Sequence, residues 1–276
     1  MFKRIISRLD VKNGILVKGI SLEGLRNLGD PNYYSQKYYD DLIDEIHFQD
    51  VVASLYDRNA LIEIIEKNSK SIFVNVSVGG GIRTKADVDK LLRIGVDKIV
   101  INSAGVKNPN FLENLVKIYG ASTIAVNIDT LKYQNKYEVL IETGREKTGL
   151  ELNEWVDKLQ KIGVGEIIIT DISLEGKKKG FDINFYEKLR KRIDIPLIAH
   201  GGAGSKENIL EIFKTANVDG VSIASLFHYK YLVEEKENKT IGTNFYLKNF
   251  DFQNKSGITI IELKKYLLSK GIKVRI

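Results

Sequence analysis

The chain contains an internal repeat that relates its first half to its second half. The glycines at 79–81 align with residues 201–203 when the sequence is shifted by 122 residues, and Asp10 aligns with Asp129 at a slightly smaller shift. Each half therefore carries one Asp and one glycine-rich segment. Two such halves predict a pseudo-twofold site, in which two anion-binding loops flank two carboxylates. That arrangement suits a substrate with a phosphate at each end and acid–base chemistry in the middle.

Short apolar runs rich in Ile and Val alternate with amphipathic helical patterns along the chain. Such runs are typical of parallel strands that are buried on both faces. The predicted strands are 5–9, 46–49, 72–77, 98–101, 123–128, 166–170, 196–199 and 220–223. The predicted helices are 33–43, 60–67, 86–93, 110–118, 152–162, 183–192 and 208–215. Eight βα units indicate a (βα)8 TIM barrel, and the repeat favours this closed barrel over a doubly wound open sheet because two four-unit halves complete a ring.

We expect one TIM-barrel domain over residues 1–276, with an insertion at 231–257 before the last helix. The insertion is polar and lacks a clean hydrophobic period. Thr259, with Glu262 three residues later, predicts the N-terminal capping box of the last helix. Gly271 is placed to end that helix.

Composition excludes several classes of protein. The absence of cysteine excludes disulfides, thiolate metal sites and a cysteine nucleophile, and it agrees with a cytoplasmic location. No apolar run approaches the ~18 residues of a membrane-spanning helix, and no signal peptide precedes the first strand. The net charge of +6 comes from scattered lysines rather than a basic stripe, which favours a solvated surface over a nucleic-acid interface. Because the three histidines lack ligand spacing, we predict no metal and no cofactor.

The two repeat-related aspartates are the candidate catalytic residues. In TIM barrels the active site lies at the carboxyl ends of the strands. Asp10 and Asp129 end the first and fifth predicted strands, so they converge from opposite sides of the barrel mouth. One protonated and one ionised carboxyl group, separated by their environments, suit general acid–base catalysis. A single Asp at such a position would more often cap a loop or pair with a Lys, but the repeat favours a functional role.

The glycine-rich loops predict two phosphate-binding sites. Residues 79–84 follow the third predicted strand and residues 201–205 the seventh, and each loop opens a helix. Glycine lets the backbone approach a phosphate, and the N–H groups at a helix start favour anions. The next strand in each half ends in small residues that include Ser103 and Ser225, which completes the usual barrel phosphate site. Lys18, in a long first loop that resembles a lid, is a further substrate-binding candidate.

These motifs resemble the cyclase subunit of imidazole glycerol phosphate synthase over nearly the whole chain, apart from the insertion. The segments that carry the resemblance are 4–19, 29–31, 78–82, 101–104, 148–149 before Trp155, and 201–204. The resemblance implies that ammonia attacks a bisphosphate ribotide, phosphoribulosyl-formimino-AICAR phosphate. The implied products are imidazole glycerol phosphate and AICAR, formed through an imine and ring closure.

The resemblance also implies roles for individual residues. Asp10 and Asp129 match the family's catalytic pair. The predicted substrate- and phosphate-binding residues are Lys18, Gly80, Gly81, Asn102, Ser103, Thr170, Gly176, Gly202, Ala203 and Ser225. A predicted ammonia gate at the strand starts consists of Arg4, Glu45, Lys98 and Glu166, for which a purely structural ion-pair ring is the alternative. Since the chain has no Cys, the ammonia is expected from a separate glutaminase subunit, bound as a heterodimer at the N-terminal face of the barrel near Asp97.

Four features depart from the family pattern. Arg8 stands where the family commonly has a small residue, His200 replaces a usual Ser, Glu175 replaces a usual Asp, and the insertion is foreign. They suggest an alternative, an ammonia-channelling accessory subunit for amidination of a surface-polysaccharide sugar. A third reading is the single-chain aldose–ketose isomerase that shares the half-barrel repeat, but the gate charges fit the cyclase better.

Overall fold

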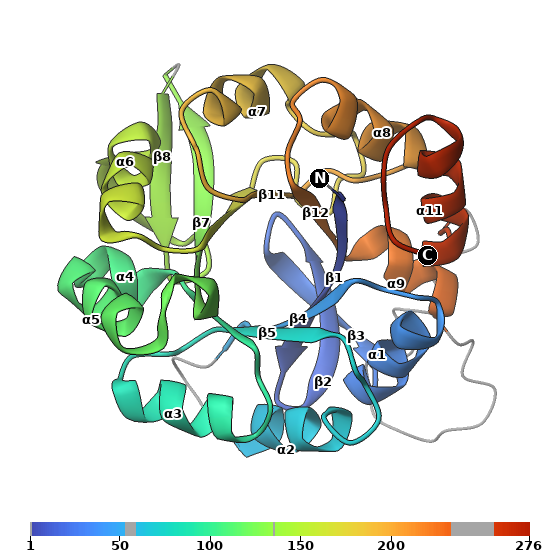
Figure 1. Ribbon diagram of the computed structural model, residues 1–276, viewed down its shortest axis with the longest axis horizontal. Coiled ribbons are helices and arrows are strands. Elements are labelled where there is room, and N and C mark those ends of the chain that lie inside the picture. The colour runs from blue at the N-terminus through green and yellow to red at the C-terminus, as the bar shows by residue number, and fades with distance from the viewer. Residues whose placement is uncertain (1, 53–58, 135, 233–256) are drawn as a thin grey trace.

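Eight parallel strands close into a barrel, as predicted (Figure 1). The computed structural model describes residues 2–52, 59–134, 136–232 and 257–276. In barrel order, the strands are β1 (Arg4–Lys12), β4 (Glu45–Asp50), β5 (Asn75–Gly79), β6 (Lys98–Ile101), β7 (Ile124–Tyr133), β10 (Glu166–Asp171), β11 (Leu197–His200) and β12 (Gly220–Ile223). Each pairs in parallel with the next, and β12 pairs with β1, which completes the ring.

Helices surround this ring and cover its outer face (Figure 1). They are α1 (Pro31–Asp40), α2 (Asn59–Asn68), α3 (Lys85–Arg93), α4 (Ser103–Lys107), α5 (Pro109–Tyr119), α6 (Leu152–Ile162), α7 (Ile183–Arg190), α8 (Lys206–Lys214), α9 (Ser225–Tyr231) and α11 (Ile260–Ser269), with a 3-10 turn η1 at Ala121–Thr123. Each predicted helix is present within a few residues of its expected bounds. Among the described residues, no helix combines the length and apolarity needed to cross a bilayer.

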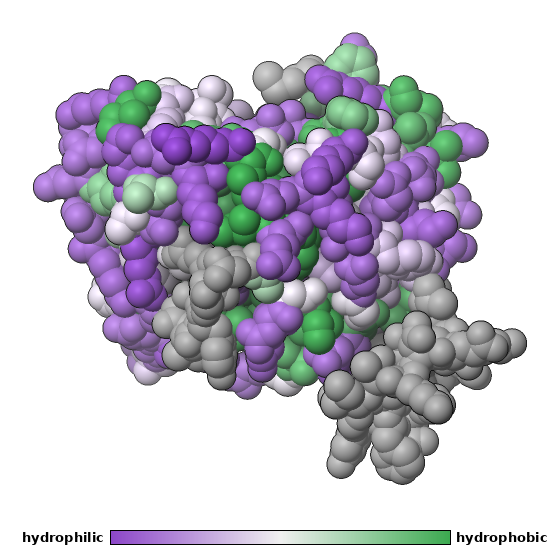
Figure 2. All heavy atoms as spheres, turned by 90° about the horizontal axis from the view of Figure 1, so that it is seen from below, coloured by the Kyte–Doolittle hydropathy of each residue, from purple (hydrophilic) through white to green (hydrophobic). Residues whose placement is uncertain are grey.

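The longer helices carry an apolar stripe that packs against the sheet. In α6 the buried residues are Leu152, Trp155, Val156 and Leu159, which recur at the helical period. Thr259 caps α11 through the predicted capping box with Glu262. Figure 2 shows the flank that lies lowermost in Figure 1, where hydrophilic side chains cover most of the surface and hydrophobic ones form a band near its middle. The predicted insertion lies almost entirely outside the described residues.

Two antiparallel hairpins extend the barrel where the sequence analysis listed no strands. The hairpin of β2 (Ile15–Ile20) and β3 (Glu23–Gly29) continues β1, and that of β8 (Lys136–Ile141) and β9 (Glu146–Glu151) continues β7. Each follows the first strand of its half, so the repeat extends to the hairpins. The pairing places Asp10 opposite Val17 and Asp129 opposite Leu140. Both candidate carboxylates therefore lie where a barrel strand becomes a hairpin strand.

Inside the barrel, apolar and polar layers alternate along the axis. A small apolar cluster fills the interior and consists of Ile6, Val100, Ala125, Ile168 and Ile198. Strand geometry brings every second residue inward, so Arg4 and Arg8 of β1 lie on opposite sides of Ile6 along the axis. The apolar layer thus separates a charged ring at the strand starts from the polar site at the strand ends.

Candidate active site

The two aspartates lie at the mouth of the barrel on strands from opposite sides. Asp10 is on β1 and Asp129 on β7, the first and fifth barrel strands, and both are almost fully buried. The predicted placement at the strand ends is confirmed. Their catalytic role is taken up below as a proposal.

Asp10 is held as a carboxylate by neighbouring cations. Arg8 Nε donates a hydrogen bond to Asp10 Oδ1 at 2.9 Å, and both side chains are about 4% exposed. Burial would raise the pKa of Asp10, but the charges of Arg8 and Lys18 and the hydrogen bond from Arg8 outweigh it and lower the pKa to about 2. Asp10 is therefore ionised throughout the physiological range and can accept a proton.

Asp129 receives its hydrogen bonds from neutral side chains. Asn127 Nδ2 donates to Asp129 Oδ1 at 2.9 Å, and Asn102 Nδ2 donates to Asp129 Oδ2 at 2.9 Å. Burial raises the pKa of Asp129, and the charge of Arg8 and the hydrogen bond from Asn127 only partly oppose it. Thr170 Oγ1 in turn donates to Asn127 Oδ1 at 2.9 Å, which fixes the orientation of that amide.

A pocket beside Asp129 reaches the first glycine-rich loop. Its lining includes Arg8, Gly80, Gly81, Asn102, Ser103 and Asp129, together with Arg83. Gly80 adopts φ +98°, and a Cβ atom there would collide with the carbonyl oxygen of Asp50, so only glycine fits. The predicted loop, its neighbour Ser103 and the candidate acid Asp129 thus share one cavity.

The second glycine-rich loop has the same construction. Gly202 adopts φ +113°, and a Cβ atom there would collide with the carbonyl oxygen of Gly180. Ser205 caps α8 through a capping box, as Thr84 caps α3 in the first half. Ser225 begins α9 and is 7% exposed. The two loops are therefore structurally equivalent, as the sequence repeat predicts. The helices that follow the next strand in each half, α4 and α9, are both short.

Lys18 is buried and ion-paired with Glu175 rather than free at the surface. Lys18 is 4% exposed, and its ammonium group contacts the Glu175 carboxylate. The same carboxylate accepts a hydrogen bond from the backbone N–H of Leu22 at 3.1 Å, and the Glu175 carbonyl accepts one from Ser21 N–H at 3.0 Å. Gly176 follows at φ +71°, packed against the β2 backbone. These contacts hold the β2–β3 hairpin against the loop that follows β10.

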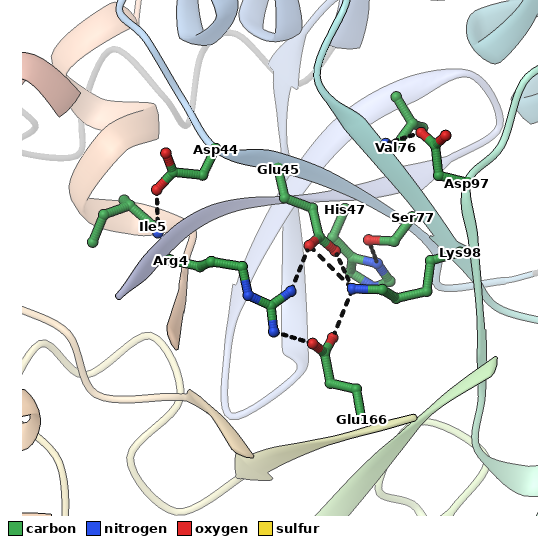
Figure 3. A network of polar contacts seen from close by, with 10 residues as sticks. All are labelled: Arg4, Ile5, Asp44, Glu45, His47, Val76, Ser77, Asp97, Lys98 and Glu166. Carbon is green, nitrogen blue, oxygen red and sulfur yellow. Dashed lines mark hydrogen bonds and ion pairs between the residues drawn. The ribbon is translucent and has the colours of Figure 1, made fainter. Parts of the chain in front are cut away.

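A closed ring of four charged side chains lies at the opposite end of the barrel (Figure 3). Each member is the first residue of its strand: Arg4 of β1, Glu45 of β4, Lys98 of β6 and Glu166 of β10. Both cations contact both anions, with Arg4 to Glu45 at 3.0 Å and Lys98 to the two glutamates at 3.2 and 3.1 Å. The predicted ring is thus present as a set of ion pairs.

Comparison with known proteins identifies the family. A profile of the Histidine biosynthesis protein family matches residues 4–232. The chain belongs to this family. It is 37% identical over 274 residues to the imidazole glycerol phosphate synthase subunit HisF of Dehalococcoides mccartyi, covering 99% of this chain and 98% of that one. The HisF subunits of Natranaerobius thermophilus (38% over 274 residues, 99% of each chain) and Petrotoga mobilis (40% over 229 residues, 82% of this chain and 90% of that one) are similarly close.

The three histidines are buried in the barrel or against it. His47 is 2% exposed and contacts Ser77 Oγ at 3.1 Å, which confirms its predicted core position. His228 packs on the Tyr38 ring, with Nδ1 2.5 Å from the Tyr38 hydroxyl. His200 Nδ1 lies 2.9 Å from the Ser222 carbonyl oxygen, while its buried Nε2 has no hydrogen-bond partner among the described residues. Burial lowers the pKa of all three, to about 3 for His47 and His228.

Sequence reasoning missed one residue of the site, Asn127. Asn127 stands two positions before Asp129, just as Arg8 stands two positions before Asp10. Side chains two apart on a strand point to the same face, so each donor reaches its aspartate. Asn127 could have been found by extending the alignment of Asp10 with Asp129 two residues towards the N-terminus, which pairs Arg8 with Asn127.

Proposed function

We propose that the chain is the cyclase subunit of imidazole glycerol phosphate synthase, which uses ammonia to convert phosphoribulosyl-formimino-AICAR phosphate to imidazole glycerol phosphate and AICAR. The observation that carries the proposal is the pair of buried carboxylates on opposite strands, whose pKa values are shifted in opposite directions. The relatives named HisF cover the chain almost from end to end. The proposed reaction requires a proton donor and a proton acceptor at the same end of the barrel.

The proposed mechanism uses the two carboxylates in sequence. Ammonia adds to the ketose carbonyl and gives a carbinolamine. Asp129, the carboxyl group whose pKa is raised, donates a proton to the departing hydroxyl group, while Asp10 accepts a proton from nitrogen, so that water and an imine form. The same pair then moves the protons that ring closure and cleavage of the product require.

The two glycine-rich loops are the proposed phosphate sites. Gly80 and Gly81 with Ser103 would bind one terminal phosphate, and Gly202 and Ala203 with Ser225 the other. The half-barrel repeat places equivalent loops on both sides of the carboxylates, which matches a substrate with two phosphates. Lys18, Asn102, Thr170 and Gly176 complete the proposed substrate-binding set. Asn102 holds Asp129, and Lys18 and Gly176 fix the hairpin, so their proposed contribution is to shape the site.

The ammonia is proposed to enter through the charged ring from a glutaminase subunit at the N-terminal face. The relatives are named as subunits of a synthase, which supports a partner. Exposed apolar side chains stand just before the starts of β1, β4 and β5, namely Phe2, Leu42 and Phe73 at 54, 41 and 76% exposure. Apolar side chains around a charged centre are typical of a protein interface. Opening the ring would require at least one cation to leave its two anions.

The test is steady-state turnover of the purified chain with the bisphosphate ribotide and excess ammonium salt at high pH, followed by substrate absorbance. We expect turnover in the wild type and a loss of ~10²-fold or more in Asp129→Asn and in Asp10→Asn. Wild-type-like activity in either variant would remove that residue from the mechanism. Absence of turnover in the wild type would instead support the accessory subunit for sugar amidination, an alternative that the comparisons do not favour.

A further inference from the structure

We propose that Arg8 and its repeat-related counterpart Asn127 assign opposite roles to the two carboxylates, proton acceptor in the first half and proton donor in the second. The inference rests on the proposed function, because it divides the acid–base work of that reaction. It concerns positioning residues, since neither is proposed to exchange a proton itself. The sequence predicts that Arg8 departs from the family pattern, so we expect the device to be particular to this chain.

The geometry of the two pairs is nearly identical. Arg8 Nε lies 2.9 Å from Asp10 Oδ1, and Asn127 Nδ2 lies 2.9 Å from Asp129 Oδ1. Both donors come from the residue two positions before the aspartate, on the same inward face of the strand. All four side chains are buried, at 3 to 4% exposure. The two halves therefore differ at this point mainly in charge, a guanidinium on one side and a neutral amide on the other.

Charge decides which proton state each site favours. A buried carboxylate beside a cation is stabilised, whereas one that receives only neutral donors still bears most of its desolvation cost. The charge of Arg8 also lowers the pKa of Asp129 on the opposite side of the barrel mouth, but Arg8 makes its hydrogen bond to Asp10. The ion pair thus leaves Asp129 as the group that takes up a proton first.

Other charged and titratable groups surround Asp10, and their arrangement does not replace Arg8. Those that act on Asp10 from the neighbouring elements are Lys18 of β2, His47 of β4, Asp129 of β7, His200 of β11 and His228 of α9. Glu175, after β10, acts on Arg8. Lys18 is already paired with Glu175, and burial keeps the histidines neutral. Arg8 is therefore the cation that contacts the Asp10 carboxylate among the described residues.

The decisive variant copies the second half into the first. In Arg8→Asn, Asp10 would have the same neighbour two positions earlier, a neutral amide, that Asp129 has in Asn127. We expect its titration midpoint to rise by about 1 to 3 pH units, the range for loss of an adjacent cation. The probe is the carboxyl 13C signal of Asp10 in the full chain, assigned by its absence in Asp10→Asn and followed from pH 7 down to the lowest pH at which the chain stays folded. Over that range the wild-type signal should stay at its ionised position, and the Arg8→Asn signal should begin to shift. The acidic limb of the pH profile of kcat/KM, with kcat/KM calculated from the concentration of free ammonia, should move in the same direction.

Two further variants separate charge from shape. Arg8→Lys retains the cation and should leave the midpoint within about 1 pH unit of the wild type, and it also serves if Arg8→Asn fails to fold. Arg192→Met removes an exposed Arg from its pair with Asp157 and should change neither the signal nor the activity. An unmoved Asp10 midpoint in Arg8→Asn, or equal midpoints in the Lys and Asn variants, would overturn the inference. Because the NMR titration needs no turnover, it stands even if the wild type proves inactive as a cyclase.

Discussion

Acidification should lower the free energy of unfolding of this protein steeply, because the folded chain buries its histidines in the neutral form. His47 and His228 have pKa values lowered to about 3 by burial, and that of His200 is also lowered. In the unfolded chain each would have a pKa near ~6.5. As pH falls through that value, the unfolded state binds protons that the folded state cannot, so the free energy of unfolding decreases.

The size of the effect follows from these shifts. Between pH 7 and pH 5, a histidine with pKa about 6.5 unfolded and about 3 folded removes about 2 kcal/mol of stability, so His47 and His228 together remove about 4 kcal/mol. His200 adds to the loss. The raised pKa of Asp129 has the opposite sign, because its folded carboxyl takes up a proton earlier than the unfolded one, and it offsets part of the change. Asp10 contributes only at lower pH, as the pH falls from about 4 towards 2.

The assay is urea unfolding at half-unit steps from pH 5 to pH 7. The chain has one tryptophan, Trp155, which is 1% exposed in α6, so its fluorescence reports loss of the core packing. His228→Phe keeps an aromatic ring against Tyr38 and should reduce the proton uptake on unfolding at pH 5 by about one. A free energy of unfolding that changes by less than about 1 kcal/mol over this range, or a slope that His228→Phe leaves unaltered, would refute the assignment of neutral buried histidines.

Two further predictions concern the loops around the mouth. Gly202→Ala should raise KM for the bisphosphate by about 10-fold or more, because its Cβ would collide with the Gly180 carbonyl in a phosphate loop; Gly120→Ala, also at positive φ but in open space, is the control and should leave KM unchanged. Glu175→Gln should lower the free energy of unfolding by about 3 kcal/mol because it leaves a buried ammonium unpaired. Urea titration measures the loss, and a Lys18→Met, Glu175→Gln double variant that recovers none of it would contradict this cause.

The barrel could be predicted from sequence because its signals are local. Buried parallel strands are short runs of Ile and Val, and the alternation with amphipathic helices sets the βα order. The internal repeat then predicted that the sheet closes into a barrel, a property that no single segment of the sequence indicates. The hairpins of β2 with β3 and of β8 with β9 were missed because one strand of each, β3 and β9, is polar and only partly buried and so lacks a clean alternation.

The site was predictable as far as the repeat reached. Asp10, Asp129 and the glycine loops stand at equivalent places in the two halves, and the structure places each at the strand ends. The partner of Lys18 could not be found this way, since Glu175 lies 157 positions away and meets it only through the folded hairpin. The pKa values were likewise beyond the sequence, because burial and the contact from Arg8 set them together.

A duplicated half-barrel makes two equivalent carboxylates, but the proposed reaction needs two different ones. Identical environments would give two groups with the same intrinsic affinity for a proton, which would protonate in two steps only through their mutual repulsion. Changing the residue two positions before one aspartate from a neutral donor to a guanidinium breaks that equivalence without altering the backbone. The cost is a buried cation, and Asp10 offsets that cost directly through its ion pair. An arginine at this position can therefore be retained by an acid–base site, provided that Asp10 remains ionised.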